Sequence, residues 1–168
     1  MLPTWIKPQL AALVTKPPAD DDWLHAIKLD GYRMHARLDA GKVQILTRRS
    51  DDWTDKHPTI ANPIAGLPAR NAYRHGELWG VLPDGRTAFN LIQSATDGGD
   101  GALALSLFDL LYLDGEDLRA LPLIDRKLWL EAPLAGAPAS VRLNDHQAGH
   151  GAVGAFDQTV ARRSAIAQ

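Results

Sequence analysis

The stretch K-L-D-G-Y-R at residues 28–33 is the part of the sequence around which the fold can be assembled. From Tyr32 to Leu38 apolar and polar side chains alternate, which is the period-2 pattern of a half-buried strand. Apolar residues also precede the stretch, and Asp30-Gly31 is a typical tight-turn pair. The pattern predicts a β-hairpin in which Lys28 ends one strand and Arg33 begins the next, so that both basic side chains lie at one rim. Taken alone, the stretch also fits an ordinary structural hairpin.

Further strands and helices are predicted from the hydrophobic periodicity and from turn residues. Strands are expected at residues 23–27, 32–38, 42–48, 72–82, 102–113 and 140–143, and helices at residues 57–67, 89–95, 121–134 and 150–160. The run 102–113 is the most apolar and should be buried on both faces of a sheet. The helical residues expected to face the body of the protein are Phe89, Ile92, Gln93, Leu128, Leu130 and Leu134. Together these elements predict an α+β fold with antiparallel sheets flanked by helices.

Composition narrows the class of protein. The chain has 168 residues, 45% hydrophobic and 23% charged, which is typical of one globular domain. It has no cysteine, which excludes disulfides, thiol catalysis and cysteine-based zinc sites. No apolar run is long enough for a membrane helix and the first residues lack a signal-peptide core, so we expect a cytoplasmic protein that does not contact membranes. The net charge of −2 argues against a strong general nucleic-acid binder.

Four short motifs follow one another along the chain. They are K-x-D-G-x-R at residues 28–33, T-R-R at 47–49, G-E-L at 76–78 and L-F-D-L-L at 107–111. In this order and at these distances they resemble the motifs of covalent nucleotidyltransferases, specifically of ATP-dependent DNA ligases. The motif sequences are similar to those of the ligase domain of bacterial multi-domain end-joining ligases, and the resemblance covers roughly residues 6–160. It implies a nucleotidyltransferase (ATP-grasp-like) adenylation domain with a nucleotide cleft.

The resemblance implies a catalytic residue, a binding set and cofactors. Lys28 would be the nucleophile, because a neutral primary amine can attack the α-phosphate of ATP and expel pyrophosphate, giving a lysyl-AMP phosphoramidate. The implied nucleotide-binding residues are Ile27, Asp30, Arg33, Arg48, Glu77 and Phe108. ATP and Mg²⁺ are the implied cofactors. The implied partners are nicked or broken DNA in repair and recombination, with end-binding repair proteins or another chain as further possible partners.

Particular roles follow for four of these residues. Arg33 and Glu77 would hold the ribose, and Arg48 would contact the ribose or the 5′-phosphate of a nick. Phe108 would stack on adenine, since an aromatic face suits a purine. Two structural alternatives stay open, because Phe108 lies in an apolar run and Glu77 follows a glycine. The spacing of His75, His146 and His150 defines no metal site, so the metal ligands are left undefined.

The sequence departs from the family pattern in three places. Family members often carry glutamate where Ala26 stands, and the usual D-G-E reads H-G-E at residues 75–77. The family continues into E-G-x-x-x-K, a lysine-bearing strand and an OB-fold domain, whereas residues 162–168 read R-R-S-A-I-A-Q. We therefore expect an extended arm at 1–22, a partial adenylation domain at 23–161, incomplete at its C-terminus, and an unstructured tail at 162–168 without an OB-fold.

These departures predict impaired ligation by this chain alone. The first alternative is a non-catalytic ligase remnant that binds nucleotide weakly or binds a partner chain. The second is an RNA ligase or a capping-type nucleotidyltransferase, because these enzymes share the lysine motif.

Overall fold

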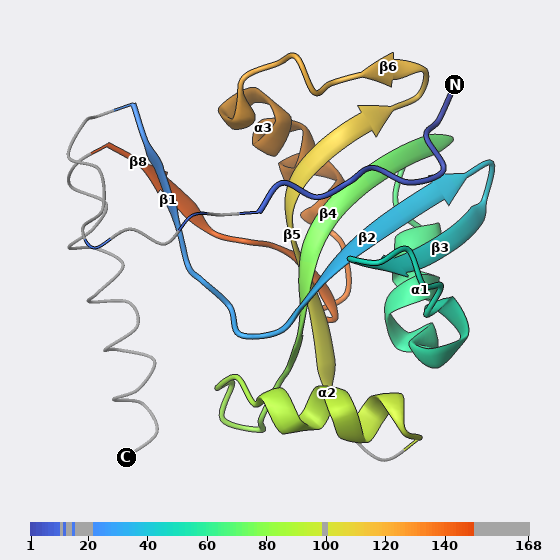
Figure 1. The fold of residues 1–168 in the computed structure, drawn as a ribbon, viewed down its shortest axis with the longest axis vertical. Coiled ribbons are helices and arrows are strands. Elements are labelled where there is room, and N and C mark those ends of the chain that lie inside the picture. Colours follow the sequence, from blue (N-terminus) through green and yellow to red (C-terminus); the bar gives the residue numbers. More distant parts are fainter. Residues whose placement is uncertain (11, 13–14, 16–21, 99–100, 150–168) are drawn as a thin grey trace.

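A computed structural model describes residues 1–10, 12, 15, 22–98 and 101–149, and a twisted six-stranded sheet forms its centre (Figure 1). The strands of this sheet are β2 (Tyr32–Asp39), β3 (Lys42–Thr47), β4 (Asn71–Gly80), β5 (Leu103–Leu113), β6 (Glu116–Asp117) and β7 (Val141–Leu143). Their order is β3-β2-β4-β5-β6, and β7 joins the other end of β5. Every pair is antiparallel except β5–β7, which is parallel. The predicted α+β class with antiparallel sheets is thereby confirmed.

In the described part of the chain, three α-helices and a short 3₁₀ turn (Thr54–Lys56) accompany the sheet. The helices are α1 (Pro58–Ala65), α2 (Phe89–Thr96) and α3 (Leu123–Leu134). Their buried residues join Met34, Ala36 and Leu38 of β2 in one hydrophobic core; they are Ile60, Ile64, Ile92, Leu130 and Leu134. Strand β5 contributes to this core along most of its length, as its continuous apolar run predicts. No helix in the described part of the chain is long and apolar enough to span a membrane.

Pro63 lies inside α1 and is tolerated there because its missing N–H is compensated. A proline cannot donate to the carbonyl four residues earlier, which here is that of Thr59. The Ser140 hydroxyl, placed just before β7, donates to this carbonyl at 3.2 Å. The contact satisfies the oxygen that Pro63 leaves unpaired and fastens α1 to the end of β7.

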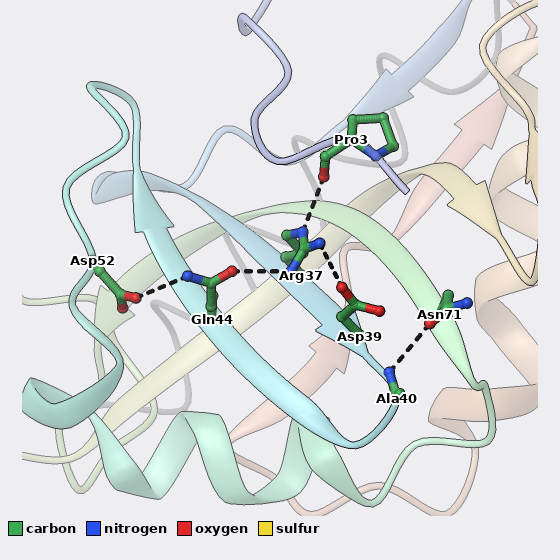
Figure 2. A network of polar contacts seen from close by, with 7 residues as sticks. All are labelled: Pro3, Arg37, Asp39, Ala40, Gln44, Asp52 and Asn71. Carbon is green, nitrogen blue, oxygen red and sulfur yellow. Dashed lines mark hydrogen bonds and ion pairs between the residues drawn. The ribbon is translucent and has the colours of Figure 1, made fainter. Parts of the chain in front are cut away.

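The N-terminal arm crosses the opposite face of the sheet (Figure 1). Figure 2 shows how one arginine of β2 holds it: Arg37 Nε donates to the Pro3 carbonyl at 2.9 Å, and the other two nitrogens donate to Gln44 and Asp39. Nearer the N-terminus, Leu2 packs with aromatic residues of β4 and β5. The arm therefore covers the face of β2, β4 and β5 that the helices leave open.

The hairpin predicted around Asp30-Gly31 is wrong. Strand β1 (Leu24–Ala26) pairs with β8 (His146–Ala148) in a separate two-stranded sheet, and residues 27–31 form a linker. Gly31 is needed for a close approach rather than for a turn: a Cβ atom there would lie 2.1 Å from the Leu78 carbonyl oxygen. The linker thus passes directly against β4, which carries Glu77.

Several helix predictions also need correction. Phe89 is 42% exposed, but its ring contacts Tyr32 of β2 with ring centres 5.2 Å apart, so it faces the sheet as predicted. Leu128 is 52% exposed and Gln93 is exposed, so these two side chains do not face the core. Ile92, Leu130 and Leu134 are buried as predicted. The helix predicted at residues 150–160 and the tail at 162–168 lie outside the described residues.

Candidate functional site

Three cavities meet around the linker that carries Lys28. The first, called here the Lys28 cavity, has a volume of about 220 Å³ and is lined by Ile27, Lys28, Leu29, Glu77, Phe108 and Asn144. The Arg48 cavity, about 570 Å³, shares Glu77 and is lined also by Arg33, Thr47, Arg48, Arg49 and Trp53. The Lys127 cavity, about 520 Å³, shares Phe108 and Asn144 and is lined also by Ala26, Arg33, Asp109 and Lys127. Because neighbouring cavities share lining residues, the three cavities are sections of one cleft.

Register places Arg33 and Glu77 beside each other. They are directly opposite on the antiparallel pair β2–β4, where side chains of facing residues are neighbours. The Glu77 carboxylate accepts a hydrogen bond from the backbone N–H of Gly31. Burial raises the pKa of Glu77, against the opposing effects of Arg33 and Lys28. Burial likewise lowers the pKa of Arg33, so both groups are partly desolvated at the cleft wall.

Phe108 reaches the cleft because of a β-bulge. Gly76 pairs with Leu107 and His75 pairs with Asp109, which leaves Phe108 as the extra residue on β5. A bulge of this kind re-aims a side chain relative to the regular alternation. The Phe108 ring therefore lines the cleft, and the guanidinium of Arg33 lies over it at 4.6 Å from the ring centre. The structural alternative, a Phe108 buried in the hydrophobic core, is not what the structure shows.

The linker before Lys28 is held by Asn144. Its side-chain amide donates to the Ile27 carbonyl at 3.2 Å, and its backbone N–H donates to the Leu107 carbonyl at 2.8 Å. Asn144 thus ties the linker to β5 next to Phe108. Nothing in the sequence pattern singled out this residue, because its position beside Ile27 depends on contacts between segments far apart in the chain.

A second group of charged side chains, from β5 and α3, adjoins Phe108 in the cleft and was not predicted as part of the site from the sequence. Arg126 of α3 pairs with Asp109 at 3.2 Å, and both side chains are 15% exposed. Lys127 is 3% exposed, and burial lowers its pKa against the opposing effects of Asp109 and Asp145. Arg126 and Lys127 end the stretch L-P-L-I-D-R-K at residues 121–127, for which the sequence predicts only a helix.

The structure brings most of the sequence-predicted residues together. Ile27, Lys28, Glu77 and Phe108 share the Lys28 cavity, and Arg33 and Arg48 line the adjoining Arg48 cavity. Asp30 is exposed on the linker and acts electrostatically on Glu77, whose pKa it raises. Their roles toward a nucleotide stay predictions.

The cleft offers few ligands for a resident metal. Among the described residues, no three His, Asp or Glu side chains are grouped so that they could hold an ion. Mg²⁺ commonly keeps several waters and binds through one or two carboxylates together with phosphate oxygens. Asp30, exposed on the linker two residues after Lys28, fits an arrangement in which the ion arrives with the phosphates of the substrate.

Comparison with known proteins finds relatives of this chain among DNA ligases. The family model for the ATP dependent DNA ligase domain matches residues 8–161. Multifunctional non-homologous end joining protein LigD of Pseudomonas aeruginosa is 43% identical over 136 residues, covering 80% of this chain and 16% of that protein. A probable DNA ligase of Streptomyces coelicolor is 36% identical over 124 residues, covering 68% of this chain and 24% of that protein. The chain thus spans less than a third of these relatives.

Two solved structures share the fold. The ligase domain of Mycobacterium tuberculosis LigD superposes with a TM-score of 0.66 at 26% identity, covering 80% of this chain and 44% of that one. A mycobacterial DNA ligase D complexed with ATP and MES superposes with a TM-score of 0.67 at 23% identity, covering 88% and 49%. The family model spans nearly the whole chain and both structures have the same fold. The chain belongs to the family of ATP-dependent DNA ligase domains.

Proposed function

We propose that this chain performs the first step of DNA ligation, the transfer of AMP from ATP to the side-chain nitrogen of Lys28. The observation that supports it is the meeting of Lys28, Glu77 and Phe108 on one cavity, although they come from a linker and two strands. In this step the Lys28 amine, having lost a proton to solvent, forms a bond from Nζ to the α-phosphorus. The bond from that phosphorus to the bridging oxygen breaks, and its electron pair leaves with pyrophosphate.

In this proposal the nucleotide lies in the Lys28 and Arg48 cavities of the cleft. Phe108 would stack on the base with the ring face that lines the Lys28 cavity, since Arg33 lies over the ring at 4.6 Å. Arg33 and Glu77, paired across β2 and β4, would hold the ribose hydroxyls. Ile27 and Asp30 flank the nucleophile, and Arg48 is placed to contact the ribose or a DNA 5′-phosphate in the Arg48 cavity. When bound with ATP, Mg²⁺ would neutralise phosphate charge beside Asp30.

Transfer of AMP to a DNA 5′-phosphate and sealing of a nick or break belong to the proposal as later steps. The chain carries a net charge of −2, so few of its groups can neutralise DNA phosphates and its binding to DNA should be weak. We therefore expect slow self-adenylation and no nick sealing by this chain alone. End-binding repair proteins or another chain would have to hold the DNA.

The test is incubation with α-labelled ATP and Mg²⁺, followed by peptide mapping of the labelled chain. The expected result is one acid-labile label on Lys28, lost in Lys28→Ala and retained in Lys42→Ala, because Lys42 is exposed at the far β2–β3 turn. A label that survives Lys28→Ala would refute the assignment. Nucleotide binding without any label would favour the alternative, a non-catalytic nucleotide-binding remnant. Joining of a nicked duplex in low salt that depends on Lys28 would overturn the expectation of no sealing.

A further inference from the structure

We propose that His75 is a positioning residue of this cleft, which accepts a hydrogen bond from Arg33 and so fixes that guanidinium over the Phe108 ring. Arg33 Nη2 lies 3.2 Å from His75 Nδ1, and the Arg33 guanidinium lies 4.6 Å from the Phe108 ring centre. The inference rests on the proposed function, because it concerns how the same nucleotide cleft is held in shape.

The direction of this hydrogen bond follows from the chemistry of the two groups. An arginine side chain can only donate, so His75 Nδ1 must be unprotonated and must accept. His75 is therefore a neutral imidazole with its proton on Nε2. A neutral acceptor orients the guanidinium without cancelling its positive charge, which stays available to an anionic nucleotide. An aspartate in this place would pair with Arg33 as an ion.

Two buried rings, those of His35 and Tyr73, pack edge-on against His75. His35 is its cross-strand partner, with ring centres 4.3 Å apart. The Tyr73 hydroxyl accepts the backbone N–H of Ile6 at 3.0 Å and forms a second hydrogen bond with His35 Nδ1 at 2.7 Å. Burial lowers the pKa of His35 to about 4, so this ring is also neutral at neutral pH. Trp5 of the arm stacks on the outer side of His35, with ring centres 6.2 Å apart and planes inclined by 11°.

Electrostatics keep His75 neutral across the physiological range. Burial, then His35, Arg33 and Arg126, lower the pKa of His75 to about 3. Asp109, opposite on β5, is paired with Arg126, and Glu77, the next residue of β4 on this face, lies opposite Arg33. No acid therefore stabilises a charged His75 directly. The acceptor role of Nδ1 is thus maintained at neutral pH.

The first experiment reads the tautomer without any nucleotide. Nitrogen-15 spectra of the histidine-labelled chain should show His75 Nδ1 unprotonated and Nε2 protonated, with no change between about pH 7 and about pH 6. In Arg33→Ala the His75 Nδ1 shift should move toward that of a nitrogen without a donor. A protonated Nδ1, or an Nδ1 shift that is unchanged in Arg33→Ala, would overturn the proposal. This readout stands whether or not the chain adenylates itself.

The second experiment compares three substitutions of His75 by self-adenylation with ATP and Mg²⁺. The amide oxygen of His75→Asn lies near the place of Nδ1, whereas that of His75→Gln lies near the place of Nε2, and His75→Leu has no acceptor. The expected result is a KM for ATP close to the unsubstituted value in His75→Asn and about 10-fold higher in His75→Gln and His75→Leu, in line with loss of a charge-assisted hydrogen bond. Thermal unfolding of all three checks that the chain remains folded.

A double-substitution cycle separates positioning from general stability. If His75 acts through Arg33, His75→Leu should add no further rise in KM once Arg33 is alanine. Equal defects in the Asn and Leu variants, or an undiminished effect of His75→Leu in the Arg33→Ala background, would overturn the proposal. Absence of ATP binding and labelling by the unsubstituted chain would instead refute the proposed function, while the tautomer result would still report on the Arg33 contact.

Discussion

Arg33 and Glu77 face each other directly across β2 and β4, and a backbone N–H from the linker that carries Lys28 is bonded to the Glu77 carboxylate. Two strands and the linker thus converge on one carboxylate. Because Gly31 can approach the Leu78 carbonyl so closely, the linker lies against β4 at this point. The position of Lys28 relative to Glu77 is therefore set by backbone packing rather than by a turn within residues 28–33.

Glu77→Gln should lower labelling by ATP about 10- to 100-fold without destabilising the chain. Burial raises the pKa of Glu77, so its ionised form opposes folding above the pKa of the unfolded chain, and stability is lost as pH rises through the folded value. Glutamine keeps an acceptor for Gly31 and removes the charge. Urea unfolding at neutral pH should therefore give an equal or higher free energy of unfolding. Glu131→Gln, exposed on α3, is the matched control for both measurements; a Glu77→Gln chain less stable than this control would contradict the argument.

Acid should destabilise the chain through His35 and His75. Burial is the first cause that lowers their pKa values, from 6.5 to about 4 for His35 and about 3 for His75. The unfolded chain therefore binds more protons below about pH 6.5, so stability falls as pH falls through this window. At about pH 5 each histidine should cost about 2 kcal/mol of unfolding free energy relative to neutral pH. Urea unfolding across this range checks it, and the double variant His35→Asn/His75→Asn should show a clearly flatter profile; an unchanged slope would count against these two residues as the source.

Gly31→Ala should destabilise the chain by roughly 3 kcal/mol or more and reduce labelling of Lys28. The new Cβ atom would lie 2.1 Å from a backbone oxygen of β4, so the linker must move away from Glu77. Gly66→Ala is the control, since its Cβ atom would lie 3.5 Å from the nearest atom, the Pro63 carbonyl oxygen, in helical backbone. That control should change stability by only about 0.5 kcal/mol. Thermal unfolding measures the stability of both variants, and incubation with labelled ATP measures the labelling of Lys28. A fully active Gly31→Ala chain would show that labelling does not need this position of the linker.

Phe108→Ala should weaken ATP binding about 10- to 100-fold, as expected for loss of one base-stacking contact. The ring is half-buried at a bulge and lines the cleft, so the loss of stability should be smaller than for a core phenylalanine. Isothermal titration with ATP and Mg²⁺ measures the first quantity and urea unfolding the second. Trp129→Ala, at a ring 53% exposed on α3, is the control that should leave ATP binding unchanged. Equal ATP affinity in Phe108→Ala would remove Phe108 from the binding set.

The sequence alone determined the order of the long strands and of the helices, and some members of the candidate site. Period-2 alternation and long apolar runs report the burial of a segment, and they located β2 and β5 close to their observed bounds. The motifs identified Lys28, Glu77 and Phe108 as candidate site residues, and all three line one cavity in the structure. Local chemistry also located the β2–β3 turn, where Gly41 takes a φ of 87°.

Only the tertiary structure decided which strands pair and which neighbours each site residue has. Strand β1 pairs with β8 instead of β2, because a partner is selected by packing between segments far apart in sequence, which periodicity does not report. The bulge that turns Phe108 into the cleft arises from the register of β4 against β5, and Asn144 meets Ile27 only through that sheet. His75 likewise became an acceptor for Arg33 only once β2 and β4 were aligned and the N-terminal arm had covered their outer face.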